Sequence, residues 1–283
     1  MFNLLRMDLY RMKRSKSVYV CFVSMLGVIV LCYLMIYLLV TPEGQKTAEK
    51  IGMLTVYDSD GNVISDPEMR MAMIEEGNSL LEGVDLLDMF RESNMDGGVY
   101  NVLFGIAVAL LVCADYKGGA MKNIMSLHRN RWPYIGNKLM AAGILDFVYL
   151  VLSFGFNCLV NLLFGNMVPF GSWGDILFYL AWAWLVSLAF GALIIALCVL
   201  TRSVTVGVLG AVLGGSGLIV MIVSRFLGYF HLNGWVKYTI YQTITYGPST
   251  YTSLEDLRCV AVGLIFLVLY SAVSITALIK RDI

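Results

Sequence analysis

Six long runs of the chain contain no charged side chain and are almost entirely apolar. They cover residues 17–42, 97–114, 147–174, 176–201, 203–224 and 259–279. About 20 apolar residues in a helix cross the ~30 Å hydrocarbon core of a membrane, and each run approaches or exceeds that length. Lipid offers the backbone no hydrogen bonds, so a helix is expected in each. The pattern predicts an all-α polytopic membrane protein with six transmembrane helices, at about 18–40, 98–114, 139–165, 174–201, 203–227 and 257–279.

The first 16 residues show the pattern of an amphipathic helix. Apolar residues recur at helical spacing, and most of the basic residues fall elsewhere on the helical wheel; the apolar positions are Phe2, Leu5, Leu9 and Met12. We predict a cytosolic interfacial helix over residues 1–16, followed by the six-helix domain over residues 17–283. The alternative is a basic flank that only sets the orientation of the first span.

The segment between the first two spans, residues 41–97, is polar and acidic. The turn residues of Asp58–Asn62 lie between short apolar stretches and predict a small hairpin. Apolar residues at three- and four-residue steps then predict a helix over 67–92. The Asp-rich turn lacks the twelve-residue calcium loop with its terminal Glu, so we interpret it as a solvated turn.

The segment before the last span, residues 228–256, is aromatic and almost uncharged. Such side chains belong at the level of the lipid headgroups, which predicts an interfacial belt or short helices that dip into the leaflet. At its end, Ser253–Asp256 has the residue types of an N-cap with an acidic first turn.

Basic residues are concentrated on one side of the predicted membrane domain. Thirteen of the 20 Lys and Arg residues lie in the N-terminal arm, in the loop 115–138, at Arg202 or at the C-terminus. Because Lys and Arg favour the cytosolic side, both termini and this loop are predicted to be cytosolic, with residues 41–97 and 228–256 extracellular. A composition of 59% hydrophobic and 14% charged residues agrees with a membrane protein. No nucleic-acid partner is predicted.

Motifs for nucleotide binding and catalysis are missing from the sequence. It contains no GxxxxGKS/T loop, no HExxH and no GxSxG, and its two histidines, His128 and His231, are predicted on opposite sides of the membrane. The six cysteines lie in or beside apolar runs, where we expect small apolar side chains and no disulfides or zinc. We predict that the chain is not an enzyme and binds no metal or cofactor, so another protein supplies any energy that it uses.

Three intramembrane features are candidate sites. Asp146 is predicted ~12 Å inside the third span. An acid at that depth is a functional-site hypothesis by default, and the alternative is a hydrogen-bonded Asp that ties helices together, for example beside Arg202. A glycine face on the fifth span permits close packing within one subunit or at a dimer seam, through Gly207, Gly210 and Gly214. Three tryptophans suit an interface or a cavity wall: Trp173, Trp182 and Trp184.

The loop 115–138 carries the most specific pattern, beginning DYKGGAMKNIM from Asp115 to Met125. Together with six spans, cytosolic termini and absent nucleotide motifs, it resembles the permease subunits of ABC-2 type ABC transporters. That family places an acidic residue four before a Gly-Thr pair, followed by an aliphatic residue and a Lys. Those positions are taken here by Asp115, Gly119, Met121 and Lys122, with Ala120 where Thr is usual. Arg131, Tyr134 and Lys138 match the residues that lead into the third span.

The resemblance implies that this loop, called the coupling loop below, holds a helix that docks into a separate ABC ATPase subunit. The docking residues implied are Asp115, Tyr116, Lys117, Gly118, Gly119, Met121, Lys122 and Asn123. It also implies a second permease subunit, as a homodimer or a heterodimer, and ATP with Mg on the ATPase partner rather than on this chain.

The function implied is ATP-driven export through a bacterial cell membrane. The cargo would be amphipathic or hydrophobic, such as a peptide, an antimicrobial or a lipid-like molecule, and small members of the family resemble peptide or lantibiotic export and immunity permeases. One alternative is a non-transporting membrane sensor or scaffold whose acidic extracellular segment binds a ligand. Another is an intramembrane enzyme centred on Asp146.

Overall fold

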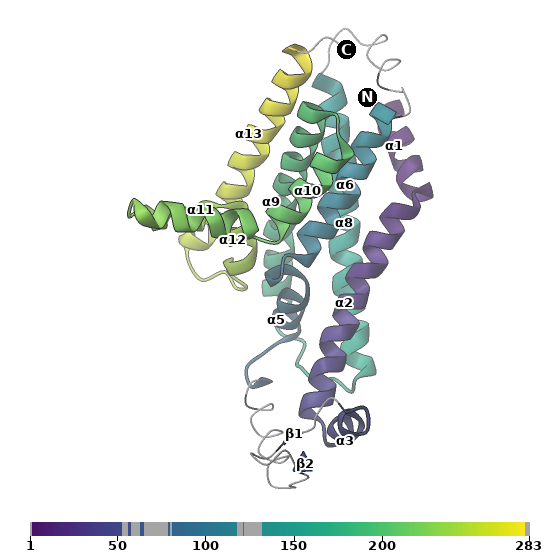
Figure 1. The fold of residues 1–283 in the computed structure, drawn as a ribbon, viewed down its shortest axis with the longest axis vertical. Helices are drawn as coiled ribbons and strands as arrows, with labels where there is room; N and C mark the ends of the chain where they lie inside the picture. The colour runs from purple at the N-terminus through teal and green to yellow at the C-terminus, as the bar shows by residue number, and fades with distance from the viewer. Residues whose placement is uncertain are drawn as a thin grey trace.

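The computed structural model describes residues 2–52, 56–57, 63–64, 79, 81–117, 121 and 132–280, and this part of the chain is almost entirely helical (Figure 1). Five helices are long and apolar enough to cross a membrane: α2 (Lys16–Val40), α6 (Val99–Lys117), α8 (Trp132–Leu163), α9 (Trp173–Thr201) and α13 (Arg258–Lys280). A sixth span results if α10 (Val204–Gly215) and α11 (Leu218–Tyr229) count as one bent span. The predicted all-α class is confirmed, together with five or six helices that are long and apolar enough to span a membrane.

Shorter elements lie before and between the long helices. α1 (Phe2–Arg14) precedes α2, and α3 (Pro42–Lys50) follows it. Strands β1 (Val56–Tyr57) and β2 (Val63–Ile64) pair antiparallel, as the predicted hairpin requires. Half of the predicted helix 67–92, residues 67–78 and 80, lies outside the described residues. The described half is not one continuous helix, because residues 82–85 are not helical and Gly83 takes a φ of +83°. Its end contains α5 (Leu86–Phe90), which continues into a π-helical stretch, η1 (Arg91–Asp96).

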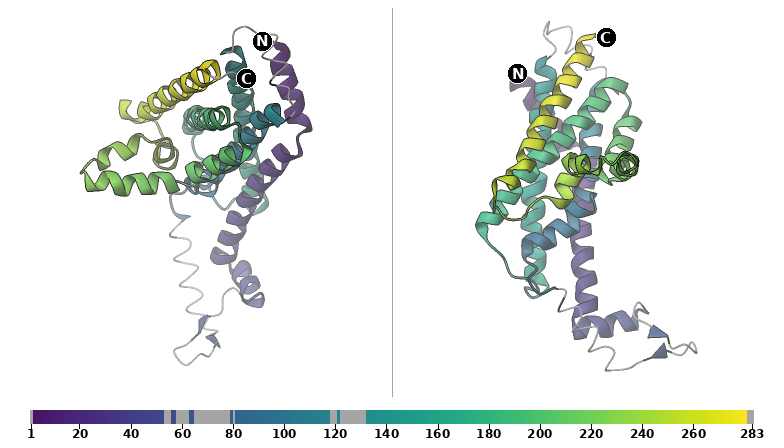
Figure 2. Two further views of the ribbon diagram at one scale, coloured as in Figure 1. Left: turned by 45° about the horizontal axis from the view of Figure 1, so that its top comes forward. Right: turned by 90° about the vertical axis from the view of Figure 1, so that its left-hand side faces the viewer.

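α9 is the central helix of the bundle. It packs against α6, α8, α10 and α13, while α2 packs against α6 and α8. In the most apolar 18-residue stretch of α9, 72% of the residues are buried. The corresponding share is 22% in α2 and in α13, so these two helices present most of their surface outward. A helix that is apolar on all sides belongs in such a centre. Both chain ends lie at the same end of the bundle (Figures 1 and 2).

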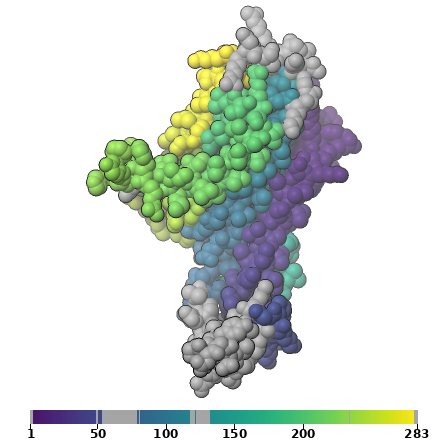
Figure 3. All heavy atoms as spheres, in the orientation of Figure 1, coloured from purple at the N-terminus to yellow at the C-terminus, as the bar shows by residue number. Residues whose placement is uncertain are grey.

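The fifth predicted span, 203–227, is not one continuous helix. The chain turns by 60° between α10 and α11, because Gly217 takes a φ of +75°, which residues with a side chain adopt reluctantly. A Cβ at Gly217 would lie 2.3 Å from the ring of Tyr241, so the close contact also requires glycine. The 12 residues of α10 rise only ~18 Å, and α11 then projects sideways from the bundle (Figures 1 and 3).

Short helices form the aromatic segment before α13, and their place at a membrane surface stays a prediction. They are η2 (Asn233–Tyr238), α12 (Ile240–Tyr246) and η3 (Leu254–Leu257). Ser253 and Asp256 form a capping box at the start of η3, with Asp256 Oδ2 accepting from the Ser253 backbone N–H at 2.7 Å. The predicted N-cap is therefore confirmed, and it directs the chain into α13.

Candidate functional site

A buried ion cluster closes the base of the coupling loop. Lys138 Nζ on α8 lies 2.7 Å from Asp115 Oδ2, near the end of α6, and 2.8 Å from Asp8 Oδ1 on α1. Arg11 of α1 pairs with Asp115 Oδ1, and Tyr134 Oη donates to Asp115 Oδ2 at 3.0 Å. These residues, with Asn137, form what we call the loop-base cluster. It joins α6 and α8, the helices before and after the loop, to each other and to α1.

The loop-base cluster has two carboxylates and two cations, so its formal charges balance. Asp8, Asp115 and Lys138 are at most 1% exposed. Burying an ion costs several kcal/mol unless close partners and hydrogen bonds compensate, and here Asn137 Nδ2 also donates to Asp8 Oδ2 at 2.6 Å. Burial raises the pKa of the Asp8 carboxyl, although the neighbouring Lys138 ammonium acts to lower it.

Asp8 and Arg11 were not recognised as site residues from the sequence. Asp8 lies three residues after Leu5 and four before Met12, which places it on the apolar face of α1. An acidic residue on the apolar face of an otherwise basic helix is the sequence pattern that could have identified Asp8. Its partner Lys138 is separated from it by 130 residues, so the pairing itself leaves no local pattern.

The predicted ATPase-docking residues occupy different environments. Asp115 and Met121 are buried, 0% and 3% exposed, so their side chains point into the chain. Tyr116 is half-buried, and α6 ends at Lys117. The other predicted residues lie outside the described part of the chain: Gly118, Gly119, Lys122 and Asn123. Asp115 thus organises the base of the loop, and docking of an ATPase stays a prediction.

Asp146 of α8 is completely buried between α6 and α9. Tyr100 Oη donates to Asp146 Oδ1 at 2.7 Å, and Ser187 Oγ lies 2.6 Å from Asp146 Oδ2. Ser187 Oγ also lies 2.8 Å from the Ala183 carbonyl oxygen. A serine has one hydroxyl proton, so both contacts are satisfied when Asp146 is the neutral acid and donates to Ser187, which then donates to Ala183.

This geometry matches the alternative of a hydrogen-bonded Asp that ties helices together. No ion pair to Asp146 is present within the described ranges. The suggested neighbour Arg202 is the C-cap of α9, fifteen residues from Ser187, or ~22 Å along the helix. Tyr100 and Ser187 are therefore the partners that sequence reasoning missed, because neither has a local signature.

The predicted glycine face of α10 packs inside the chain. A Cβ at Gly207 would lie 2.5 Å from Cys198 Sγ, and one at Gly210 would lie 2.5 Å from Leu197 Cδ1, both on α9. Gly214 likewise faces α9, with a Cβ 3.1 Å from a ring atom of Phe190. Of the two predicted roles, close packing within one subunit is the one that these contacts support.

The three predicted tryptophans have separate roles. Trp173 is exposed at the start of α9, whereas Trp182 is buried and its Nε1 donates to the Pro248 carbonyl oxygen at 3.1 Å. Trp184 lines an apolar groove between α8, α9 and α13. The prediction of an interface or a cavity wall therefore applies to Trp184, and Trp182 belongs to the core.

Comparison with known protein families and with curated proteins found no match to this chain. In the portion of the chain that the structure describes, no group of three His, Cys, Asp or Glu side chains is placed to hold a metal ion. All six cysteines are free thiols, four buried and two partly buried. A function must therefore be proposed from the chain's own residues.

Proposed function

We propose that this chain is the membrane-spanning permease subunit of an ATP-driven exporter of the ABC-2 type. Both termini and the coupling loop face the cytosol of a bacterial cell, and α1 lies along the membrane interface. Two ATPase subunits, which carry ATP and Mg, dock at the loops of a permease dimer. The cargo is amphipathic or hydrophobic and moves outward.

The observation that carries this proposal is the loop-base cluster. A loop that receives force from a motor must transmit it to the spans instead of bending at its base. Here the two ends of the loop are bound directly to each other through Asp115 and Lys138, and α1 is bound to both through Asp8 and Arg11. Displacement of the loop would move α1, α6 and α8 together as one body.

A second support is the length and apolar character of the spans, combined with the absence of nucleotide motifs from the sequence. Such a chain offers helices for a passage through the membrane and lacks the P-loop motif that cradles ATP phosphates. The dimer and the export of cargo follow from the resemblance of the coupling loop to the family.

The test is to search the neighbouring genes for an ABC ATPase and to co-purify it with this chain. We expect the wild-type permease, in vesicles, to bind that ATPase and to stimulate its ATP hydrolysis. Lys122→Glu should weaken binding about tenfold, or ~1.4 kcal/mol, because it reverses a charge on the proposed docking face. The matched control is Lys46→Glu, the same reversal on exposed α3 at the opposite end of the bundle.

Membrane insertion should be unchanged in both variants, as judged by protein yield in the membrane fraction. Equal ATPase binding and stimulation by Lys122→Glu and the wild type would contradict docking at the coupling loop. If no ATPase associates with the wild-type protein at all, the permease proposal fails and the sensor or scaffold alternative is favoured.

A further inference from the structure

A pocket of about 240 Å³ lies where the bend between α10 and α11 meets the bundle. Helices α9 and α13 contribute Phe190, Phe266 and Tyr270 to its lining, and α11 and α12 contribute Val220 and Tyr241. The rings of Phe266 and Tyr270 stack, with centroids 5.5 Å apart. The bundle thus forms one wall of the pocket, and the two helices that follow the bend form the other.

Asn101, in the first turn of α6, also lines this pocket. It is 1% exposed, and its Oδ1 has no hydrogen-bond partner among the described residues. A buried polar group without a partner costs about 1–3 kcal/mol, and native proteins contain few of them. A single such group in a pocket with apolar walls is typical of a ligand site, where it orients a molecule that apolar contacts hold.

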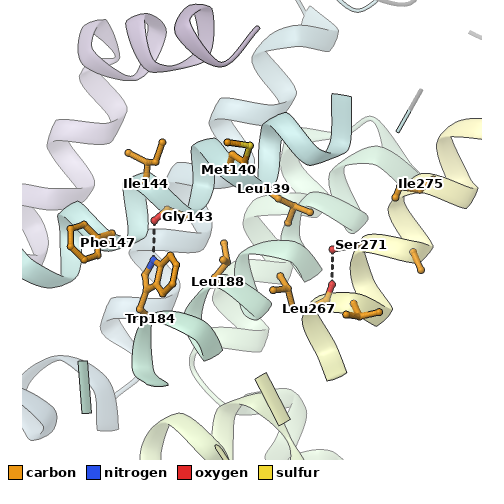
Figure 4. Close-up of a pocket in the computed structure, with 12 residues that line it drawn as sticks. Leu139, Met140, Gly143, Ile144, Phe147, Trp184, Leu188, Leu267, Ser271 and Ile275 are labelled. Carbon is orange, nitrogen blue, oxygen red and sulfur yellow. Dashed lines mark hydrogen bonds between the residues drawn. The ribbon is translucent and has the colours of Figure 1, made fainter. Parts of the chain in front are cut away.

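The larger apolar groove between α8, α9 and α13 differs in this respect (Figure 4). Both polar side chains of its lining already donate within the protein. Trp184 Nε1 donates to the Gly143 carbonyl oxygen at 2.9 Å, and Ser271 Oγ donates to the Leu267 carbonyl oxygen at 2.6 Å (Figure 4). The donors of that groove are therefore satisfied without an occupant, whereas the amide oxygen of Asn101 is not.

The size and chemistry of the pocket restrict its occupant. An apolar cavity of about 150 Å³ is large enough for benzene, so about 240 Å³ admits one ring with a small substituent. The aromatic side chains of the walls favour an aromatic ring, through offset or edge-on contacts. The Asn101 amide presents an oxygen or, after rotation about its last bond, an N–H group. A hydroxyl can satisfy either one, because it both donates and accepts.

We propose that this pocket binds a compact aromatic molecule with a hydroxyl group, of the phenol class. The hydroxyl forms a hydrogen bond with the Asn101 amide, and the ring lies among Phe190, Phe266 and Tyr270. The site does not depend on the proposed transport function, because it is defined by the pocket and by the unpaired amide oxygen.

The test uses two probes of nearly the same shape, 4-fluorophenol and 4-fluorotoluene, which differ in a hydroxyl and a methyl group. Binding to the full-length protein in detergent is measured by fluorine NMR, and partition into protein-free detergent is subtracted. Asn101→Leu keeps a side chain of similar shape and removes the amide. We expect this variant to bind 4-fluorophenol at least about fivefold more weakly than the wild type does, because the hydroxyl loses its hydrogen bond. Binding of 4-fluorotoluene should stay within about twofold, since a methyl group forms no such bond.

Filling the pocket should exclude both probes. Val220 of α11 belongs to the lining, and Val220→Phe should weaken the binding of each probe about fivefold or more because a larger side chain occupies the space. The matched control is Val223→Phe, at an exposed position of the same helix outside the lining, which should leave binding unchanged. Absence of saturable 4-fluorophenol binding to the wild type would overturn the proposal, since the pocket then holds only water. Equal losses of the two probes in Asn101→Leu, or undiminished binding to Val220→Phe, would overturn it as well.

Discussion

At the scale of single residues, burial and the nearest partners decide what an acid can do. Asp8 and Asp146 are both inaccessible to solvent, yet their surroundings differ. Asp8 faces the ammonium of Lys138 at 2.8 Å, so it takes part in a charged cluster. Asp146 faces two hydroxyl groups, Tyr100 and Ser187, and is best satisfied as a neutral acid. The first is an ionic anchor and the second a hydrogen-bonded tie between helices.

The hydrogen bonds of a neutral Asp146 with Tyr100 and Ser187 predict which substitutions this position tolerates. Asp146→Asn keeps an oxygen to accept from Tyr100 and an N–H to donate to Ser187, so we expect the free energy of unfolding in detergent to change by less than about 1 kcal/mol. Asp146→Ala removes these bonds and leaves a cavity, and should cost ~2–4 kcal/mol. Denaturant titration of the two variants measures this. Equal losses in Asn and Ala would show that the carboxyl group itself is required.

At the scale of helices, glycine allows α10 to approach its neighbours at backbone distance. A Cβ at Gly215 would lie 2.8 Å from the backbone nitrogen of Val102 on α6, an atom that cannot move without moving the helix. Two residues further along the chain, Gly217 permits the bend that separates α10 from α11. The glycines of this region therefore set both where α10 packs and where it ends.

Gly215→Ala should force α6 and α10 apart. We expect a loss of ~1–3 kcal/mol in the free energy of unfolding, because overpacking a close helix contact strains the backbone. Gly27→Ala is the control, since no atom lies within 4 Å of a Cβ at Gly27 of α2, and there alanine should stabilise the helix by ~0.5–1 kcal/mol. Thermal unfolding of both proteins measures the difference. A harmless Gly215→Ala would mean that the helices adjust freely.

At the scale of the whole molecule, the loop-base cluster holds the end that carries the termini together. α1 begins the chain and α8 lies in its middle, and they are joined to each other and to α6 by ion pairs of Lys138 and Arg11. Among the described residues away from this end, the ion pair of Arg91 with Asp96 lies within η1 and therefore joins no two helices. The two ends of the coupling loop are thus bound to each other and to α1.

Replacing Lys138 should loosen the attachment of α1 to α6 and α8. Lys138→Met leaves Asp8 buried beside Asn137 without a cation, and we expect a loss of ~3–5 kcal/mol. Asp8→Asn in the same background removes the uncompensated charge and should restore ~1 kcal/mol or more. The free energies of unfolding of Lys138→Met, Asp8→Asn and the double variant form a double-mutant cycle. Protease cleavage within residues 2–14 measures the release of α1 from the bundle. If the two losses simply add, Asp8 and Lys138 are not coupled.

Much of the architecture follows from the sequence without any knowledge of contacts. The apolar runs predict the spans, because the transfer of a helix into lipid depends on the composition of that segment alone. The hairpin at Val56 and Ile64 and the cap at Ser253 were also predictable, since turns and caps use residues a few positions apart. The six-span count depends on how the bent pair α10 and α11 is regarded, and the bend was not foreseen.

Sequence alone therefore determined that this chain is a helical membrane protein, which segments are apolar enough to span, and that one side is rich in Lys and Arg. Only the tertiary structure decided that Asp8 meets Lys138 and that Asp146 meets Tyr100 and Ser187. It also decided which neighbour each glycine of α10 faces: α9 for Gly207, Gly210 and Gly214, and α6 for Gly215. The physical reason is distance along the chain. Hydropathy, turns and caps act within one helix length, whereas a buried charge is satisfied by whichever partner the packing of remote helices brings within about 3 Å.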